Sequence, residues 1–154
     1  MGIKHREDSL VAMRAGLPTP KEVKLAELAA ACTAAIYAGV EVKTTKGKER
    51  FALTMHDQAN LARFVVQAQA GESVLYHADG RLVRLFAPDE ILKITAAATA
   101  HKTHHLTRVN HLNAWVRRTE DDAELAAITY DSRLPDDLDK SLAKLLNKDA
   151  PNNG

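Results

Sequence analysis

Apolar and polar residues follow two different periods along the chain, one typical of helices and one typical of strands. Between Lys24 and Gly39 the apolar residues recur at steps of three, four and seven, which indicates an amphipathic helix with one buried face. The residues of this face are Leu25, Leu28, Ala29, Cys32 and Ile36. Gly39 follows the last of them and predicts a helix that ends in a left-handed cap.

The next segment changes to the alternating period of a half-exposed strand. Val40 and Val42 alternate with charged residues, and Phe51 and Leu53 recur at the same spacing a little later. With a turn at Lys46-Gly47, Val42 is predicted to face Phe51 and Val40 to face Leu53. This pairing places all four apolar side chains on one face of a hairpin.

A second helix is predicted to begin after Thr54. Thr54 and Asp57 have the spacing of a capping box, with Asp in the place of the usual Glu. The apolar stripe that follows predicts the buried face, and Gly71 is expected to end the helix. The residues of that stripe are Leu61, Phe64, Val65 and Ala68.

A second hairpin is predicted around Asp79-Gly80, because both central positions of a type I′ turn require positive φ. Counting outward from this turn pairs Tyr76 with Val83 and Val74 with Leu85. The opposite face is then unusually apolar, and we expect the N-terminal arm or another chain to cover it. That face would carry Leu75, His77, Leu82, Arg84 and Phe86.

The longest predicted helix begins at Pro88, a residue favoured at the first helical position, with Asp89 and Glu90 in its first turn. The pattern continues to Arg118, so the helix would be about 45 Å long at 1.5 Å per residue. A strand of five or six residues spans only about 17–20 Å. We therefore expect much of this helix to project beyond the sheet and to be covered by a neighbouring subunit.

Two short helices are predicted after Arg118. The first begins in the cap-like segment 119–122 and the second follows Pro135. Their apolar residues are Leu125, Ala126 and Ile128 in the first, and Leu138, Leu142 and Leu145 in the second. The order of elements predicts an α+β fold, a small antiparallel sheet of two β-hairpins packed on helices, with one long projecting helix.

Three parts are expected along the chain. Residues 1–20 form an N-terminal arm, in which a helical stretch over 6–15 is interrupted by Gly16, Pro18 and Pro20. Residues 21–130 form the α+β domain. Residues 131–154 form a C-terminal helix and a polar tail.

Composition excludes several classes of partner. The formal net charge of +1 gives no electrostatic case for nucleic acid, which requires a strong basic patch. No stretch approaches the roughly 20 apolar residues of a membrane span, and no apolar segment follows the N-terminal charges as in a secretory signal. We expect a protein made in a cytoplasm, with partners that are neither nucleic acid nor membrane.

Cys32 is the only cysteine, so no intrachain disulfide can form. It lies on the apolar stripe of the first predicted helix, where a free cysteine usually behaves as a small buried hydrophobe. A reactive or intermolecular thiol is the alternative interpretation.

Four of the seven histidines lie on the long helix, and His101 and His105 have the i, i+4 spacing that lets two imidazoles reach one metal. They are the candidate metal ligands. However, Lys102 stands where a metalloprotease helix carries its Glu. His101 and His105 also continue the apolar stripe of the helix, which favours a structural or inter-subunit role and no bound cofactor.

Other polar groups have simpler explanations. Asp57 is accounted for by capping, and Gln58 and Asn60 on the same helical turn are expected to contact a neighbouring loop, with ligand binding as the alternative. The acidic pairs at 121–122 and 136–137 stand at helix starts, where negative charge is favourable. The sequence contains no Gly-rich phosphate loop and no Gly-x-Ser-x-Gly motif.

Four features in a fixed order resemble a known family. They are the block from Lys24 to Gly39, the Asp57-Gln58-x-Asn60 helix start, the Asp79-Gly80 turn and the Ala100-His101 step in the long helix. Together, over residues 21–130, they resemble the DUF4376 group, found in phage and prophage tail genes, commonly in or beside tail-fibre and fibre-assembly proteins. The chain departs from that pattern at Ala87, where the family often has Thr or Ser, and again after Tyr130.

The resemblance implies a setting, because the family has no established catalytic residues to carry over. We expect a non-enzymatic structural protein of a bacteriophage tail, in the baseplate, tail tip or tail-fibre attachment point, located in the virion after synthesis in the host cytoplasm. The expected partners are other tail proteins, in a homo-oligomer (a trimer) or a hetero-complex. The residues expected to make these contacts are Trp115, Leu112, Val116, Leu106, Leu75, Phe86, Leu138 and Leu142.

Two alternatives remain. A tail-fibre assembly chaperone would use the same amphipathic helices and be absent from the mature virion. A metal-dependent enzyme would be built on His101 and His105.

Overall fold

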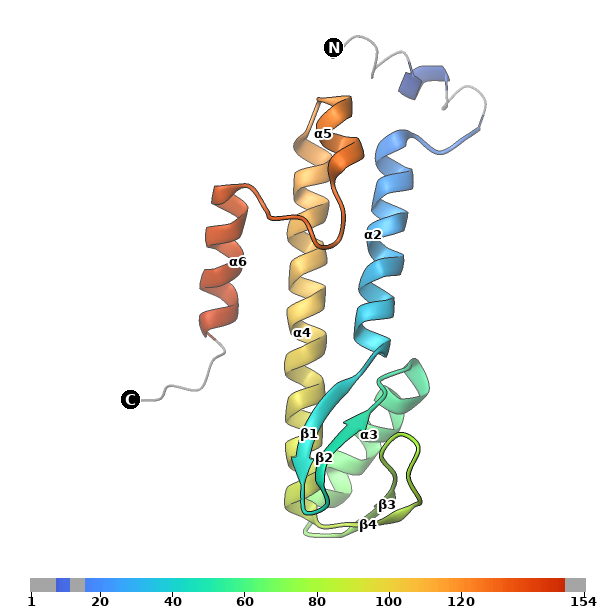
Figure 1. The fold of residues 1–154 in the computed structure, drawn as a ribbon, viewed down its shortest axis with the longest axis vertical. Coiled ribbons are helices and arrows are strands. Elements are labelled where there is room, and N and C mark those ends of the chain that lie inside the picture. The colour runs from blue at the N-terminus through green and yellow to red at the C-terminus, as the bar shows by residue number, and fades with distance from the viewer. Residues whose placement is uncertain (1–7, 12–15, 149–154) are drawn as a thin grey trace. The chain divides into compact units, whose positions relative to one another are not determined.

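The computed structural model describes residues 8–11 and 16–148 and has the α+β fold expected from the sequence (Figure 1). Its two hairpins form two separate antiparallel sheets of two strands each, where the sequence predicted one sheet. The elements are α2 (Pro20–Tyr37), β1 (Val40–Thr44), β2 (Gly47–Phe51), α3 (Met55–Gln69), β3 (Val74–Tyr76), β4 (Arg84–Phe86), α4 (Pro88–Arg118), α5 (Asp122–Ala127) and α6 (Asp136–Lys148).

The ends of the chain were predicted to form a helical arm and a polar tail. Residues 8–11 are helical. The remainder of the predicted N-terminal helix, 6–7 and 12–15, and the predicted tail at 149–154 lie outside the described residues.

The chain divides into two compact units. One comprises residues 33–105, and the other combines residues up to Cys32 with those from Leu106 onward. Both α2 and α4 therefore contribute one end to each unit.

The core of the 33–105 unit is built on three aromatic rings. The ring centroids of Phe51 and Tyr76 are 6.0 Å apart, as are those of Phe51 and Phe86. Ile91 and Ile94 of α4 are completely buried in the same cluster. Because a hairpin of such short strands is marginal in water, this shared core accounts for the stability of both hairpins.

The register of the first hairpin differs from the prediction by two residues. Val40 is paired with Phe51, and Val42 with Glu49. The turn is formed by residues 45–46, and Gly47 follows it with φ +92°. A shift of two residues preserves the face of every side chain, so the apolar face is as expected, but the wrong turn position concealed that Glu49 is buried.

The register of the second hairpin differs by one residue, which moves the side chains of β4 to the opposite face and leaves those of β3 as predicted. Val74 is paired with Phe86, and Leu75 with Leu85. The prediction that Phe86 lies on the outer face is therefore wrong, because Phe86 is completely buried beside Val74. The outer face carries Leu75 and Leu85 instead.

The loop between β3 and β4 explains this shift. The Asp79 amide donates a hydrogen bond to the carbonyl oxygen of Arg50 (2.8 Å), and the Ala52 amide donates one to Asp79 Oδ1 (3.1 Å). Ala78 is buried beside them. Gly80 has φ +69° while no described non-glycine residue has positive φ, so Asp79-Gly80 does form a turn, but not the type I′ turn that the prediction assumed.

Two buried carboxylates share one guanidinium in this unit. Arg84 Nη2 of β4 lies 2.9 Å from Glu49 Oε1 of β2 and 3.0 Å from Glu90 Oε2 of α4. The side chains of Glu49 and Glu90 are 2% and 10% exposed. Thr44 adds a short hydrogen bond to Glu49, and the Arg84 guanidinium lies over the Phe86 ring. The network connects both hairpins to the first turn of α4.

The surroundings of Glu49 determine how it responds to pH. Burial by itself would raise the pKa of the Glu49 carboxyl, but the hydrogen bonds from Thr44 and Arg84 outweigh burial and lower that pKa below its ordinary value. A carboxyl group whose pKa is lower in the folded state stabilises the fold at neutral pH. This stabilisation is lost as the pH falls through the folded-state pKa.

The second unit has its own core, centred on Leu28 of α2 with Leu112 and Val116 of α4. Around them pack side chains from α5, α6 and the segment between them, namely Leu125, Ile128, Leu134 and Leu142.

Polar bonds to the backbone complete the second unit. Arg108 donates to the carbonyl oxygens of Tyr130 and Ser132, with the closest contact at 2.6 Å. The buried His111 ring connects α4 to α6. Its Nδ1 is 2.8 Å from the Thr107 carbonyl oxygen and its Nε2 is 3.0 Å from Ser141 Oγ. The segment after Tyr130 is therefore fixed to α4 by specific contacts.

The long helix is continuous from Pro88 to Arg118, as predicted. Its apolar stripe, however, is covered at both ends by the chain itself. Ile91 and Ile94 enter the core of the 33–105 unit, and Leu112 and Val116 enter the core of the other. The expectation that another chain must cover this stripe is therefore wrong, because each end is covered by the chain itself.

Gly39 supports a first prediction. It ends α2 with φ +85°, and a Cβ atom there would collide with the Phe51 carbonyl oxygen and lie 2.8 Å from Ala52 Cα. Gly39→Ala should lower the free energy of unfolding by about 3 kcal/mol or more, measured by urea denaturation. Gly71→Ala is the control, since Gly71 has φ +80° with open space around it, and should cost only about 1–2 kcal/mol. Equal losses would contradict the close approach at Gly39.

A second prediction concerns Glu49→Gln, which keeps the size of the side chain and removes its charge. At pH 7 this variant should be less stable by about 1.5–3 kcal/mol, the contribution of hydrogen bonds to a charged group. The difference should narrow as the pH falls below about 4.5 and through the lowered folded-state pKa of Glu49, because the wild-type carboxylate then takes up a proton too. Urea denaturation of both proteins at a series of pH values measures this difference in the free energy of unfolding.

The matched control is Glu72→Gln, because Glu72 is exposed in the same unit. It should change stability by no more than about 0.5 kcal/mol at any pH. A loss at Glu49 that is constant with pH would show that its charge does not stabilise the fold.

Candidate functional site

The outer face of the β3–β4 hairpin is the most exposed apolar surface of the 33–105 unit. Leu75 and Leu85 are direct cross-strand partners, and they are 66% and 61% exposed. Leu82 and Val83 precede β4 and are 91% and 59% exposed. We call these four exposed residues, from the outer side of the strands and from the loop before β4, the leucine face. An apolar surface of this kind often marks a site of protein contact.

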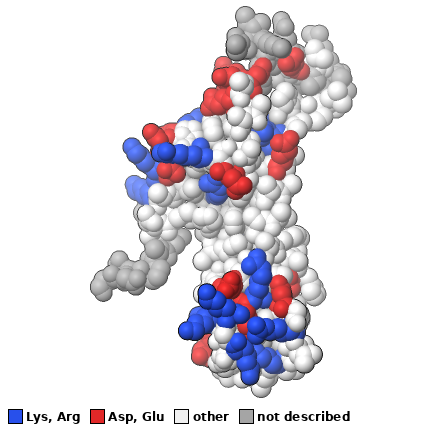
Figure 2. Space-filling view, in the orientation of Figure 1, with Lys and Arg blue, Asp and Glu red and all other residues white. Residues whose placement is uncertain are grey.

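Cations gather on the other hairpin of the same unit, and one adjoins the leucine face. Figure 2 shows Lys and Arg side chains concentrated over the β1–β2 hairpin. Lys43 and Lys48 are cross-strand partners on its exposed side, although like charges directly opposite each other are destabilising. Arg81, next to Leu82 in the chain, keeps 51% of its side chain exposed although it is 3.5 Å from Glu49. This end of the unit therefore favours acidic groups.

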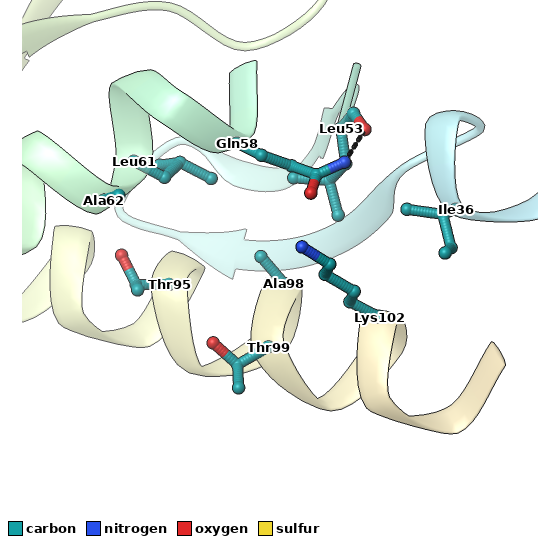
Figure 3. Close-up of a pocket in the computed structure, with 9 residues that line it drawn as sticks. All are labelled: Ile36, Leu53, Gln58, Leu61, Ala62, Thr95, Ala98, Thr99 and Lys102. Carbon is teal, nitrogen blue, oxygen red and sulfur yellow. Dashed lines mark hydrogen bonds between the residues drawn. The ribbon is translucent and has the colours of Figure 1, made fainter. Parts of the chain in front are cut away.

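A cavity of about 160 Å³ also lies within the 33–105 unit (Figure 3). Apolar side chains from the end of α2, from the segment after β2, from α3 and from α4 form most of its wall. They are Ile36, Leu53, Leu61, Ala62 and Ala98. The polar residues that line it are Gln58, Thr95, Thr99 and Lys102.

Helix periodicity explains which side of α4 borders the cavity. Thr95, Ala98, Thr99 and Lys102 follow the i, i+3, i+4, i+7 spacing of one helical face. On α3, the capping box of Thr54 and Asp57 fixes the first turn, because the Thr54 hydroxyl accepts from the Asp57 amide and the Asp57 carboxylate accepts from the Thr54 amide. Gln58 is the next residue, and this cap directs it toward the cavity.

The histidine pair was the candidate metal site. The rings of His101 and His105 are 4.6 Å apart at an angle of 76°, and His101 Nε2 lies 2.9 Å from the carbonyl oxygen of Ala35. Since a carbonyl oxygen only accepts, Nε2 of His101 carries the proton. In the described part of the chain, no three His, Cys, Asp or Glu side chains are grouped so that they could hold a metal ion.

Cys32 is buried, as predicted, with 4% of its surface exposed. Burial raises the pKa of its thiol, and a hydrogen bond with the Tyr130 side chain offsets only part of that effect. Burial likewise raises the pKa of Tyr130 to about 12. Both groups are therefore held in their neutral forms at physiological pH.

The eight residues expected to contact partners fall into two groups. Leu112, Val116, Phe86 and Leu142 are buried in the chain's own cores, so they offer almost no surface to a partner. The others retain exposure. Leu75 and Leu106 are exposed, whereas Leu138 and Trp115 pack partly against the second core. Trp115 also donates from Nε1 to Glu124 at 2.6 Å.

Sequence reasoning did not identify the cavity. In the sequence, Lys102 stands out only as the residue at the position of a metalloprotease Glu, and Thr95 and Thr99 are not among the candidate site residues. The i, i+3, i+4, i+7 spacing of Thr95, Ala98, Thr99 and Lys102 was the available signal. This spacing indicates a cavity only once it is known that α3 and the end of α2 lie opposite that face of α4.

No helix among the described residues is both long enough and apolar enough to cross a membrane.

The buried thiol gives a third prediction. Since the thiolate is the reactive form, Cys32 in the folded protein should react with a disulfide reagent on the order of a hundredfold more slowly than in urea, equivalent to an opening free energy of about 2.8 kcal/mol. A colorimetric thiol assay under both conditions measures the ratio. Equal rates would show that Cys32 is accessible in the native state.

Comparison with known proteins gives one match. The family described as Domain of unknown function (DUF4376) matches residues 19–130, well over half of the 154-residue chain. No curated protein and no solved structure matches the chain significantly.

Proposed function

The chain belongs to the DUF4376 family, and from this premise we propose that it is a non-enzymatic structural protein of a phage tail that acts through protein–protein contacts. It would stand in the baseplate, the tail tip or the tail-fibre attachment point. The tail setting comes from the gene context associated with this family. The contact role comes from the surface of the 33–105 unit.

The observation that carries the contact role is the exposed leucine pair of the β3–β4 hairpin. Leu75 and Leu85 lie directly opposite each other, with 66% and 61% of their surfaces exposed. Full burial of one leucine contributes about 1.5–3 kcal/mol. A partner that covered the leucine face would therefore gain affinity from a small area.

The chemistry around the leucine face indicates what the partner offers. Arg81 adjoins Leu82, and the exposed lysines Lys43 and Lys48 lie on the other hairpin of the same unit. The complementary surface would offer apolar side chains to the leucine face and a carboxylate to Arg81. Charges at a rim accelerate association and select the partner more than they add affinity.

This distribution of charge favours a hetero-complex over a homo-oligomer. If two leucine faces met about a two-fold axis, each would bring its own Arg81 to the other, and like charges across an interface are unfavourable. We therefore propose a different tail protein as the occupant of the leucine face. The homotrimer expected from the sequence relied on the cyclic symmetry of phage tails and on an uncovered long helix, and its second ground is weakened because Ile91, Ile94, Leu112 and Val116 of that helix are buried in the chain's own cores.

An assembly chaperone absent from the mature particle is the second candidate. An exposed apolar face would also suit a protein that shields a fibre before it is mounted. Quantitative mass spectrometry of purified virions distinguishes the two. A structural protein is present in fixed stoichiometry, whereas a chaperone is abundant in the lysate and missing from the particle.

A fourth prediction concerns the leucine face in a phage that encodes this chain. Leu75→Gln combined with Leu85→Gln preserves side-chain length and removes the apolar contact. If each leucine contributes about 1.5 kcal/mol, affinity for the tail partner should fall about a hundredfold for the double variant. Incorporation into purified particles, measured by mass spectrometry, should fall with it.

The control is Val66→Thr, because Val66 lies on α3 and is also 63% exposed. It should be incorporated normally. Circular dichroism and thermal melting must show that the double variant is folded. A folded double variant incorporated at the wild-type level would overturn the proposed contact surface.

A further inference from the structure

The cavity of the 33–105 unit combines an apolar interior with a cation at its edge (Figure 3). Its volume is about 160 Å³, and an apolar cavity of about 150 Å³ accepts benzene. Ile36, Leu53 and Leu61 on its wall are all buried. The interior therefore has room for an apolar body of about six carbon atoms.

The cation is Lys102. Figure 3 shows its side chain extending toward the cavity, with the ammonium group facing the amide of Gln58. None of the ion pairs formed by the described residues involves Lys102. An ammonium group at the edge of an apolar cavity favours a ligand that has an anionic group at one end and an apolar body. A carboxylate on a small hydrocarbon body has this chemistry.

The side chain of Gln58 is oriented so that it can position the Lys102 ammonium group. Its Nε2 donates to the carbonyl oxygen of Leu53 at 2.9 Å, and only the amide nitrogen can donate. Its Oε1 is thereby directed toward Lys102 (Figure 3). That oxygen can accept one ammonium proton and leave the others for a ligand. Gln58 acts in this way as a positioning residue for Lys102.

Thr95 provides a second polar group at a different point of the cavity. Its Oγ1 is buried and has no hydrogen-bond partner among the described residues. A buried hydroxyl left without a partner is costly, so a ligand that bonded to it would gain affinity. Thr95 and Lys102 lie seven residues apart on α4, about 10 Å along the helix axis. A ligand that reaches both groups must carry polar atoms at its two ends.

We propose that this cavity binds a small hydroxy-substituted monocarboxylic acid with a ring-sized apolar body, of which 4-hydroxybenzoate is the representative probe. Lys102 binds the carboxylate, the apolar wall encloses the ring, and Thr95 bonds to the distal hydroxyl. The site is independent of the leucine face, so it stands whether or not the chain is a tail protein.

The test is a titration of the full chain with 4-hydroxybenzoate, benzoate and benzamide, followed by two-dimensional amide NMR. Saturable shifts should centre on Gln58, Ala98 and Lys102. Benzoate should bind at least about tenfold more tightly than benzamide, since a hydrogen bond to a charged group contributes about 1.5–3 kcal/mol. Absence of saturable shifts with all three probes would overturn the proposal.

Two variants assign the roles. Lys102→Met should weaken binding of both carboxylates about tenfold and leave benzamide unaffected. The wild type should bind 4-hydroxybenzoate more tightly than benzoate. Thr95→Val, nearly the same in shape, should bind benzoate as the wild type does and should lose this difference between the two ligands. Lys93→Met is the control, because Lys93 lies on α4 outside the cavity and donates to the Lys43 carbonyl oxygen. It should bind all probes as the wild type does.

Each contrary result is decisive. Equal affinity for benzoate and benzamide, or unchanged carboxylate binding in folded Lys102→Met, would overturn the assignment of Lys102 and with it the ligand class. An unchanged preference for 4-hydroxybenzoate in Thr95→Val would overturn the assignment of Thr95 and the requirement for a distal hydroxyl.

Discussion

The Arg84 guanidinium, held between two buried carboxylates, is the interaction on which the 33–105 unit depends. Glu49 belongs to β2 and Glu90 to the first turn of α4, so one cation connects both hairpins and the long helix. Neither hairpin has enough apolar area to be stable alone. Removing one partner of such a network leaves an uncompensated buried charge, which costs about 3–5 kcal/mol. The network thus fixes the β3–β4 hairpin, and with it the leucine face, to β2 and to the first turn of α4.

Local patterns in the sequence were sufficient for the helices. The cap at Gly39, the capping box of Thr54 and the continuous helix from Pro88 to Arg118 are all confirmed, because each depends on residues close together in the chain. Strand registers depend on distant contacts and were wrong in both hairpins. The bonds of Asp79 to the backbone of Arg50 and Ala52 have no signature in the local pattern.

The same distinction applies to the sites. The sequence indicated an apolar outer face on the second hairpin and included Leu75 in it, but the one-residue slip placed Phe86 there in error. The long helix α4, which was expected to be covered by a neighbouring subunit, contributes side chains to two cores of its own chain. The cavity could not be predicted, because Lys102 and Gln58 lie on different helices and become neighbours only through the fold.

We propose that the leucine face is buried against another protein in the assembled tail. Hydroxyl-radical footprinting, which labels exposed side chains, tests it most directly by comparing the isolated protein with intact particles. If this contact exists, Leu75, Leu82 and Leu85 should be strongly protected in the particle, while the exposed Val66 of α3 should be labelled equally in both states. Equal labelling of the three leucines in particles that contain the protein would contradict it.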